Sequence, residues 1–352
     1  MTISVGLIGL GEVAQLMHLP LLADDPRFKI AGVCDVSPSL VEAMGTRYGA
    51  ELRTAKAEEI FSAPEIDAVF ILAPDYLHAE LLSRAMEAGK HAFIEKPVCL
   101  TSRELLPLIE RDKSNPKTVF VGYMRRYARP FLALKERMPA QGDIRHVRIR
   151  DLIRESHFFV DQTRHIVRPT DVPSDVVAEG WARTDALVRE VMGAEAARDA
   201  LRAYTVLTGL SSHSFSAMRE LFGQPKGVVG ARQTGGESLV VLFDYGHFTC
   251  VYEAIIHDVA RFDAGIEVLT QDAHYRINYD TPYIRNLPTR LEITRSTDHE
   301  TGTEIVGPFY EDAFRVELDA FHECVTTGAR PKTDLQDSLA DLELFAEVGR
   351  LF

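Results

Sequence analysis

The sequence has few of the features that anchor, cross-link or positively charge a protein. Its 352 residues contain only four cysteines, which are far apart and form no CxxC pair. This usage argues against a disulfide-stabilised secreted domain and predicts reduced, buried thiols. No apolar run approaches the ~18 residues of a membrane-spanning helix. Residues 1–5 enter a strand pattern without the basic and apolar regions of a secretory signal, so we expect a cytoplasmic protein with no membrane segment.

Positive charge is also scarce. Lys and Arg number 39 against 52 Asp and Glu, which gives a formal net charge of −13. This balance argues against binding to nucleic acid or to an anionic membrane surface, although it permits a locally basic pocket. The twelve histidines are scattered and show no metal-ligand spacing, so we expect no metal site.

The N-terminal residues carry a dinucleotide-binding motif. An apolar run over residues 3–8 leads into GLGEVA at 9–14, which fits G-x-G-x-x-A between a strand and a helix. Gly9 permits the tight turn, Gly11 lets the backbone approach a pyrophosphate, and the small Ala14 lets the helix pack on the strand. The motif therefore predicts a nucleotide loop at the start of the chain.

An acidic residue follows at the expected distance. The run 29–34 predicts a second strand, and Asp35 ends it 21 residues after Ala14. A carboxylate there binds the ribose hydroxyls of NAD and repels the 2′-phosphate of NADP. The next residues, 36–38 (VSP), bring no arginine, so we expect NAD, with NADP as the less favoured cofactor.

The same alternation continues through the N-terminal third. Short apolar segments at 52–54, 68–73, 92–94 and 118–121 predict further strands, and 41–48, 57–61, 78–88 and a capped segment from Thr101 predict helices between them. This rhythm is typical of a doubly wound parallel sheet in an α/β protein.

The strand at 92–94 ends in Glu95-Lys96-Pro97. Open α/β sheets bind ligands at the carboxyl ends of their strands, so a carboxylate and an amine there are candidates for a site. Pro97 restricts the backbone of Lys96 and so favours a fixed position for its ammonium group. We expect Lys96 to be the point where cofactor, substrate and second domain meet.

With these motifs in order, the chain resembles the glucose-fructose oxidoreductase/inositol dehydrogenase (Gfo/Idh/MocA) family. The matching segments are GLIGLGEVA at 6–14, HLPLL at 18–22, VCD at 33–35, AVFILAPDYLHAEL at 68–81, AGKHAFIEKP at 88–97, VGYMRRYARPF at 121–131, the residues around His213 and a C-terminal segment at 321–342. The resemblance therefore spans the whole chain, and its most specific part is EKP after A-G-K-H.

The resemblance implies a fold of two domains. We expect an NAD(P)-binding Rossmann domain at 1–122, and at 123–352 an α/β domain with a large, open, mostly antiparallel sheet. That second domain would bind substrate and form a homo-oligomer, a dimer or tetramer, through its sheet. The last helix, predicted within 334–349, is expected to pack back on the body of the protein.

The resemblance also implies site residues. Catalysis is assigned to Lys96, which polarises the reacting oxygen, and to His213 as acid or base. The residues expected at the cofactor are Gly9, Gly11, Glu12, Val13, Ala14, Asp35, Ala73, Pro74, His78, Glu95 and Lys96. Those expected at the substrate are Lys96, Tyr123, Arg126, His157 and His213.

The segment around His213 departs from the family pattern. Aligned on this histidine, the family segment D-x-G-x-H-x-x-D places Gly209 where the first aspartate stands and Ser216 where the last one stands. A carboxylate beside a histidine orients it and raises its pKa. Without one, His213 acts alone, through Ser212, or with a partner from elsewhere; the candidates are Asp151, Glu155, His157 and Asp161.

Two further features of the sequence each allow two interpretations. The segment 158–208 is longer than expected for the family; it has a loop signature at 168–173 and a long helical pattern that Gly193 divides, and it is either structural or a lid or subunit contact. Six arginines are expected along one face, where they bind an acidic substrate or form salt bridges: Arg125, Arg126, Arg129, Arg154, Arg164 and Arg168.

The expected function is hydride transfer between a nicotinamide cofactor and a hydroxyl or carbonyl group of a sugar, cyclitol or sugar acid. Two alternatives stand beside it. One is a non-catalytic, dinucleotide-dependent regulator, which the missing carboxylate at Gly209 keeps open. The other is an enzyme that uses tightly bound NAD transiently, in oxidation, elimination and re-reduction.

Overall fold

The computed structural model describes residues 2–352, so Met1, where the first expected strand pattern begins, lies outside the described residues. The chain divides into two compact units. The first runs to Tyr123 and takes in two later segments, Arg164–Glu190 and Glu317–Leu342; the second comprises Met124–Thr163, Val191–Val316 and Glu343–Phe352. Each unit draws on separate stretches of sequence, so a single boundary at residue 122 stays a prediction.

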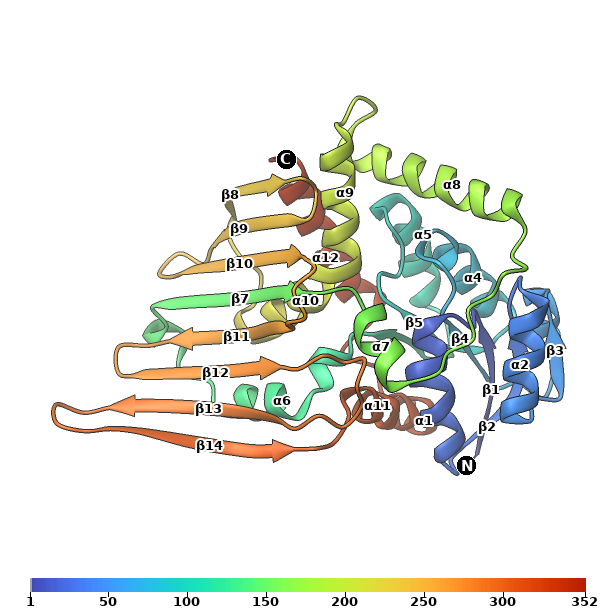
Figure 1. Cartoon of the computed structure of the whole chain (residues 1–352), viewed down its shortest axis with the longest axis horizontal. Coiled ribbons are helices and arrows are strands. Elements are labelled where there is room, and N and C mark those ends of the chain that lie inside the picture. Colours follow the sequence, from blue (N-terminus) through green and yellow to red (C-terminus); the bar gives the residue numbers. More distant parts are fainter. Residues whose placement is uncertain (1) are drawn as a thin grey trace. The chain divides into compact units, whose positions relative to one another are not determined.

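The first unit contains the expected parallel sheet (Figure 1). Its strand order is β3-β2-β1-β4-β5-β6, the doubly wound order of dinucleotide-binding domains. The strands are β1 (Ile3–Ile8), β2 (Phe28–Cys34), β3 (Leu52–Thr54), β4 (Ala68–Ile71), β5 (His91–Glu95) and β6 (Val119–Gly122). All five strand pairings of this sheet are parallel. The strand order reverses between β1 and β4, which is where such sheets bind ligands.

Helices connect these strands. They are η1 (Ala14–His18), α1 (Leu19–Asp24), α2 (Pro38–Tyr48), α3 (Ala57–Ser62), α4 (Asp75–Glu87) and α5 (Ser102–Asp112), and the segment Arg164–Glu190 adds most of α8 (Ser174–Met192). The predicted cap is present, because Thr101 accepts a hydrogen bond from the Glu104 amide. Helix α4 begins three residues earlier than predicted, since Pro74 and Asp75 suit a helix N-terminus.

Aromatic rings form the core of the parallel sheet. Phe70 and Phe93 stack with ring centroids 4.8 Å apart, and Phe93 and Phe120 stack at 5.5 Å. Phe321, from α11 (Ala313–Thr327), meets all three rings edge-on. A C-terminal segment therefore packs on the sheet that carries the nucleotide loop, within the first unit.

The second unit contains the expected large sheet (Figure 1). Its order is β14-β13-β12-β11-β7-β10-β9-β8, antiparallel except for the pair β7 and β10. The strands are β7 (His146–Ile153), β8 (Gly227–Thr234), β9 (Ser238–Asp244), β10 (Thr249–Ile256), β11 (Asp263–Leu269), β12 (Ala273–Tyr279), β13 (Thr289–Ser296) and β14 (Thr301–Phe309). The α/β fold class is thereby confirmed for both sheets.

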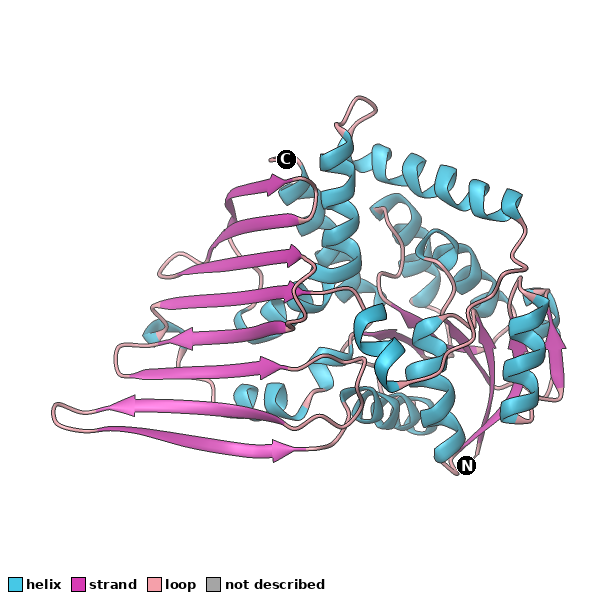
Figure 2. Cartoon of the chain, in the orientation of Figure 1, coloured by secondary structure: helices cyan, strands magenta, loops and turns pink. Residues whose placement is uncertain are grey.

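The helical segments of the second unit lie beside this sheet (Figure 2). They are η2 (Met124–Tyr127), α6 (Arg129–Glu136), η3 (Gln141–Asp143), α7 (His157–Thr163), α9 (Arg198–Val206), η4 (Leu207–Ser211) and α10 (Ser212–Phe222), while α12 (Leu335–Gly349) contributes to both units. Gly193 follows α8 with a φ of 99°, and the predicted division of the long helix there is confirmed.

Strand β14 was not predicted from the sequence. Its residues are exposed almost throughout, so they lack the apolar alternation that marks a half-buried strand. Position at the edge of the sheet explains this, because β14 pairs only with β13.

Candidate functional site

The nucleotide loop has the backbone geometry that its glycines predict. Gly9 has a φ of 94°, and a Cβ there would come within 2.6 Å of the Leu72 and Ala73 backbone. Its amide donates to the Cys34 carbonyl at 2.9 Å, which joins the loop to the end of β2. Gly11 differs, because a Cβ there would meet nothing within 4 Å. Gly9 is therefore required by the fold, whereas Gly11 borders open space in which a ligand fits.

Asp35 lies directly against this loop. Its Oδ2 accepts a hydrogen bond from the Leu10 amide at 2.8 Å, and its Oδ1 accepts one from the Ser37 amide at 2.9 Å. These two bonds fix the carboxylate at the end of β2 while leaving the side chain partly exposed. Such a carboxylate is suited to accept hydrogen bonds from ribose hydroxyls.

A pocket of about 680 Å³ opens beside the loop, within the size range of small-molecule sites. Predicted cofactor residues that line it are Gly9, Gly11, Glu12, Val13, Asp35, Ala73 and Pro74. Ala14 is buried beneath the pocket, in the packing role predicted for it. The open space over Gly11 and the partly exposed carboxylate of Asp35 fit an extended dinucleotide, and the surrounding side chains are largely apolar.

The segment Arg164–Glu190, which we call the strap, forms the other wall of this pocket. It contributes Pro169, Val172, Val176, Val177, Gly180, Trp181 and Thr184. Gln15 attaches it to the nucleotide loop: its Nε2 donates to the carbonyls of Leu10 and Val167, and its Oε1 accepts from the Val167 amide at 2.8 Å. The segment that the sequence left open between a structural and a lid role is thus part of the wall of the nucleotide pocket.

Glu95 carries the polar contacts at the end of β5. Its Oε1 lies 2.8 Å from Nε2 of the buried His18, and its Oε2 accepts from the Lys96 amide at 3.2 Å. Burial opposes ionisation of this carboxylate, but the His18 hydrogen bond and the charges of His18 and Lys96 outweigh it, so the pKa of Glu95 lies below its usual value. A negative charge is therefore maintained beside Lys96.

His78 is a positioning residue in the same unit. It is buried, with Nδ1 2.6 Å from the Pro97 carbonyl and Nε2 2.6 Å from the Ala73 carbonyl. One imidazole thus joins the end of the EKP segment to a residue that lines the nucleotide pocket. The bridge holds the start of α4 against the Glu95-Lys96-Pro97 segment, and a role for His78 at the cofactor stays a prediction.

Lys96 and Tyr123 belong to the first unit. Lys96 is partly exposed immediately after β5, at the carboxyl edge of the parallel sheet. Tyr123 is buried, and its hydroxyl donates to Ser338 Oγ at 3.4 Å. The roles of Lys96 in catalysis and of Tyr123 at the substrate stay predictions.

His213 belongs to the second unit, as the second residue of α10, and is partly exposed. Gly209, where the family has an aspartate, lies one turn earlier in the π-helical segment η4. A Cβ at Gly209 would meet nothing within 4 Å, so a larger side chain fits there. The helix therefore has room for the carboxylate that the sequence lacks.

Asp151, one candidate partner for His213, is instead part of a buried network. Its carboxylate forms an ion pair with Arg125 and accepts hydrogen bonds from Ser214 at 2.6 Å and Tyr252 at 2.9 Å. Tyr252 Oη also lies 2.7 Å from Ser211 Oγ, where it can accept a hydrogen bond. These bonds satisfy the Asp151 carboxylate beneath α10. One of its donors, Ser214, directly follows His213 in the sequence. The other candidates, Glu155, His157 and Asp161, lie exposed near α7, with His157 Nδ1 3.7 Å from Glu155.

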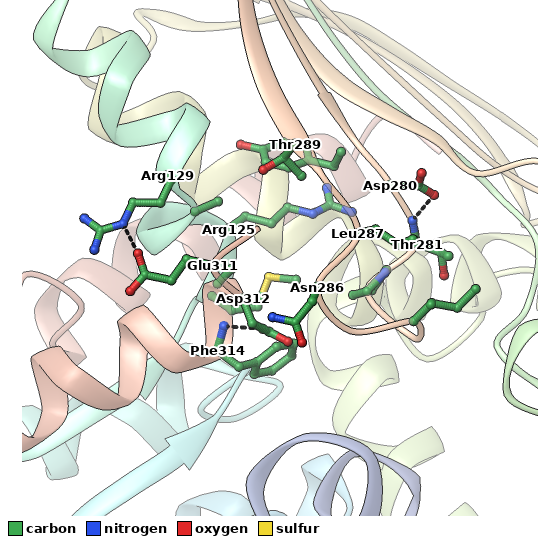
Figure 3. Close-up of a pocket in the computed structure, with 16 residues that line it drawn as sticks. Arg125, Arg129, Asp280, Thr281, Asn286, Leu287, Thr289, Glu311, Asp312 and Phe314 are labelled. Atoms are coloured by element: carbon green, nitrogen blue, oxygen red, sulfur yellow. Dashed lines mark hydrogen bonds and ion pairs between the residues drawn. The ribbon is translucent and has the colours of Figure 1, made fainter. Parts of the chain in front are cut away.

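Three of the six arginines expected along one face form ion pairs within the second unit. Arg125 pairs with Asp151, Arg126 pairs with the buried Glu220 at 2.5 Å, and Arg129 pairs with Glu311. Figure 3 shows Arg125 and Arg129 beside a small pocket, with Arg129 directed at Glu311. Arg154 lies over the Phe158 ring, and Arg164 and Arg168 fall in the first unit. A role for Arg126 at the substrate stays a prediction.

Four residues of the first unit were missed as site residues: His18, Gln15, Asp171 and Trp181. The signal for His18 was present in HLPLL at 18–22, a quoted segment whose polar residue precedes an apolar run. The others depend on the strap, whose contacts with the loop join residues about 150 positions apart and leave no local pattern. Among residues 2–352, no group of three or more His, Cys, Asp or Glu could hold a metal ion, and no helix there is long and apolar enough to cross a bilayer.

The fold and the pocket define a Rossmann-type dinucleotide-binding protein. Residues 3–123 match the model of the Gfo/Idh/MocA family, described as an oxidoreductase family with an NAD-binding Rossmann fold. The resemblance recognised from the sequence is thus confirmed over residues 3–123, which are similar to the Rossmann domain of that family.

Curated relatives match over a stretch of similar length. Inositol 2-dehydrogenase of Rhizobium meliloti is 32% identical over 136 residues, 39% of this chain and 40% of that protein. Myo-inositol 2-dehydrogenase of Thermotoga maritima is 31% identical over 132 residues, 38% of this chain and 39% of that protein. The chain thus spans about two fifths of the length of these curated relatives.

The likeness in fold extends further than the likeness in sequence. The structure of a 3-ketoreductase from Actinomadura kijaniata, solved with NADP, superposes with a TM-score of 0.74 at 18% sequence identity. The superposition covers 99% of this chain and 97% of the ketoreductase chain. At this identity the comparison establishes the fold alone.

Proposed function

We propose that the protein is an NAD-dependent oxidoreductase that transfers hydride between C4 of the nicotinamide and a carbinol carbon of a sugar or cyclitol. One observation carries this proposal: a dinucleotide pocket and the Glu95-Lys96-Pro97 segment occur together in one compact unit. The inositol dehydrogenases among the relatives support the class of substrate.

The bound cofactor would accept or donate the hydride. The chain's own residues would position the substrate, stabilise the charge on its reacting oxygen and move its proton. In this proposal Lys96 donates a hydrogen bond to the reacting oxygen and stabilises the negative charge that develops on it. Glu95 and His18 maintain a fixed negative charge beside this amine. His213 takes the hydroxyl proton or returns it.

We propose NAD over NADP on the strength of Asp35. Its carboxylate is fixed by the Leu10 and Ser37 amides, so it cannot swing away from a 2′-phosphate without losing both hydrogen bonds. A neutral substrate is favoured over a sugar acid, because Arg125, Arg126 and Arg129 each already pair with a carboxylate. Their charge would add little to the binding of an anion.

We also propose a cytoplasmic homo-oligomer. The four cysteines are free and buried, as expected in a reducing compartment. Exposed apolar side chains lie on the neighbouring strands β8 and β9, at Val229, Val240 and Leu242, and at Ile305 on β14 at the opposite edge of the sheet. Exposed apolar side chains on a sheet are suited to a subunit contact.

A substrate panel separates this proposal from the two alternatives. Purified protein would be incubated with NAD and a set of polyols, sugars and sugar acids, with NADH absorbance and product analysis as readouts. Net NADH supports the dehydrogenase. Product without net NADH indicates transient use of bound NAD, and dinucleotide binding without product indicates a regulator, the alternative that the missing carboxylate at Gly209 keeps open.

Lys96→Ala tests the catalytic assignment. We expect kcat to fall by about a hundredfold to a thousandfold, the cost of removing one donor to a developing oxyanion, while NAD affinity stays unchanged. Lys29→Ala, at an exposed lysine of β2, is the matched control and should retain full activity. An unchanged kcat in Lys96→Ala would remove Lys96 from the mechanism.

A further inference from the structure

The strap is attached to the first unit at a second place besides Gln15, close to the pocket residues Asp35 and Val172. Asp171, three residues before α8, lies against the N-terminus of α2. Its Oδ2 accepts from the Ser39 amide at 2.9 Å, and its Oδ1 accepts from the Ser37 and Ser39 hydroxyls. Asp171 is thus bound to the helix that follows Asp35, although more than 130 residues separate them in the sequence.

The donors around Asp171 are those that bind a phosphate. Two hydroxyl groups and a backbone amide at a helix N-terminus form an anion site, and the helix dipole adds to its attraction. These hydrogen bonds, with the Ser37 hydroxyl as the strongest, lower the pKa of Asp171 and keep its carboxylate charged. An anion supplied by the chain therefore already occupies this anion site.

Ser37 joins the two carboxylates at the ribose end of the pocket. Its amide donates to Asp35, and its hydroxyl donates to Asp171. A ribose whose hydroxyls bind Asp35 would carry any 2′-phosphate into a region bounded by two negative charges. Meanwhile, the serine hydroxyls that could bind this phosphate are already in use.

We propose that Asp171 is a specificity-determining residue that excludes the 2′-phosphate of NADP, by filling the anion site at the start of α2 and by adding its charge to that of Asp35. This inference rests on the proposed function, in which the pocket binds a nicotinamide dinucleotide. It assigns the strap a role in cofactor choice, because the segment is held at the loop by Gln15 and at α2 by Asp171.

The pocket contains its own reporter of binding. Trp181 is the single tryptophan of the chain, lines the pocket from α8, and is 73% exposed. Its emission overlaps the absorption of reduced nicotinamide, so NADH or NADPH bound in this pocket should quench Trp181 by energy transfer. Titration with each cofactor then gives two dissociation constants without any need for a substrate.

The test compares wild type, Asp171→Ala, Asp171→Asn and a control, Asp175→Ala. Asp175 is an exposed residue of the first turn of α8, so its replacement removes the same charge from the same segment. We expect wild type to prefer NADH. Asp171→Ala should shift the ratio of the NADPH and NADH dissociation constants toward NADPH by about tenfold. Asp171→Asn should give a smaller shift, and Asp175→Ala should match wild type.

Three outcomes would overturn the proposal about Asp171, and a fourth, different outcome would overturn the proposed function. If Asp171→Ala weakens both cofactors equally, Asp171 only attaches the strap. If Asp175→Ala shifts the ratio as much, the effect is one of general charge. If wild type prefers NADPH, the inference fails while the oxidoreductase assignment stands. Should neither cofactor quench Trp181 or bind in calorimetry, the proposed function itself fails.

Discussion

The nucleotide pocket and the region around His213 are built in opposite ways. In the pocket, backbone groups and missing side chains create the site: Gly9 makes the turn, Gly11 leaves open space, and the Leu10 amide positions Asp35. Around His213, side chains create the structure instead, because the buried network of Arg125 and Asp151 supports α10 from beneath.

This difference determines how each region responds to change. Where a missing side chain leaves space for a ligand, an added side chain should block binding while the fold remains intact. A buried charge network loses stability when atoms are removed, because each remaining charge is left without its partner in a region of low dielectric. The predictions below test this contrast, beginning with the largest expected effect.

Asp151→Ala should break the second unit most severely. Arg125 is buried, and this burial is the largest single influence on its pKa and lowers it; the charge and hydrogen bond of Asp151, with Tyr279 and Tyr252, together raise the pKa by more. The guanidinium therefore stays charged, and removal of Asp151 would leave this charge uncompensated. We expect a loss of about 3–5 kcal/mol in the free energy of unfolding, measured by urea denaturation. Arg129→Ala, which removes an exposed partner of Glu311, is the control and should cost about 0.5 kcal/mol.

A double variant keeps this prediction testable if Asp151→Ala does not fold. Arg125→Met with Asp151→Leu removes both charges, so it should be more stable than the single variant, as is found when a buried ion pair is replaced by apolar side chains. A single variant as stable as the Arg129→Ala control would show that the network contributes no more than a surface pair.

The two glycines of the loop test the other half of the contrast. Gly9→Ala should lower the melting temperature, because its φ of 94° is unfavourable for alanine and the Cβ would strike the Leu72 and Ala73 backbone. Gly11→Ala should melt like wild type but bind NADH at least about tenfold more weakly, since its new methyl group enters the space for the ligand. Thermal melts and Trp181 quenching measure the two effects separately. Equal losses of stability in both variants would contradict the division of roles.

The sequence predicts the nucleotide pocket well because local backbone geometry creates this pocket. The loop, Asp35 and the Glu95-Lys96-Pro97 segment are short, contiguous patterns whose geometry follows from local backbone chemistry. The parallel sheet also follows from the alternation of apolar strands and helices. Even the departure at Gly209 was visible, because it lies within a local motif.

What the sequence could not show depends on pairs that lie far apart in the chain. Asp151 meets Ser214 across 63 positions and Tyr252 across 101, and Asp171 meets Ser37 across 134. No periodicity or spacing links such pairs. The arginines illustrate the consequence. The sequence left open whether they bind an acidic substrate or form salt bridges, because their carboxylate partners are spread over other elements.

Gly209→Asp offers the smallest and most specific test, because it adds to the second region instead of removing from it. A Cβ at this position meets nothing within 4 Å, and residue 209 lies four positions before His213, about one helical turn. A carboxylate there should raise the pKa of the imidazole, which is the effect of a neighbouring negative charge. If His213 acts as a base, the acidic limb of the kcat/KM profile should therefore move to higher pH, and kcat should change severalfold.

The control for this test is Gly209→Asn, which has nearly the same shape without the charge and should leave the pH profile in place. In a His213→Asn background, Gly209→Asp should likewise have no effect on the limb, since the titrating group is gone. If the limb moved equally with aspartate and asparagine, or moved without His213, the carboxylate would not act through this histidine. The proton would then leave by another group, and the second region would contribute shape, not acid–base chemistry, to the reaction.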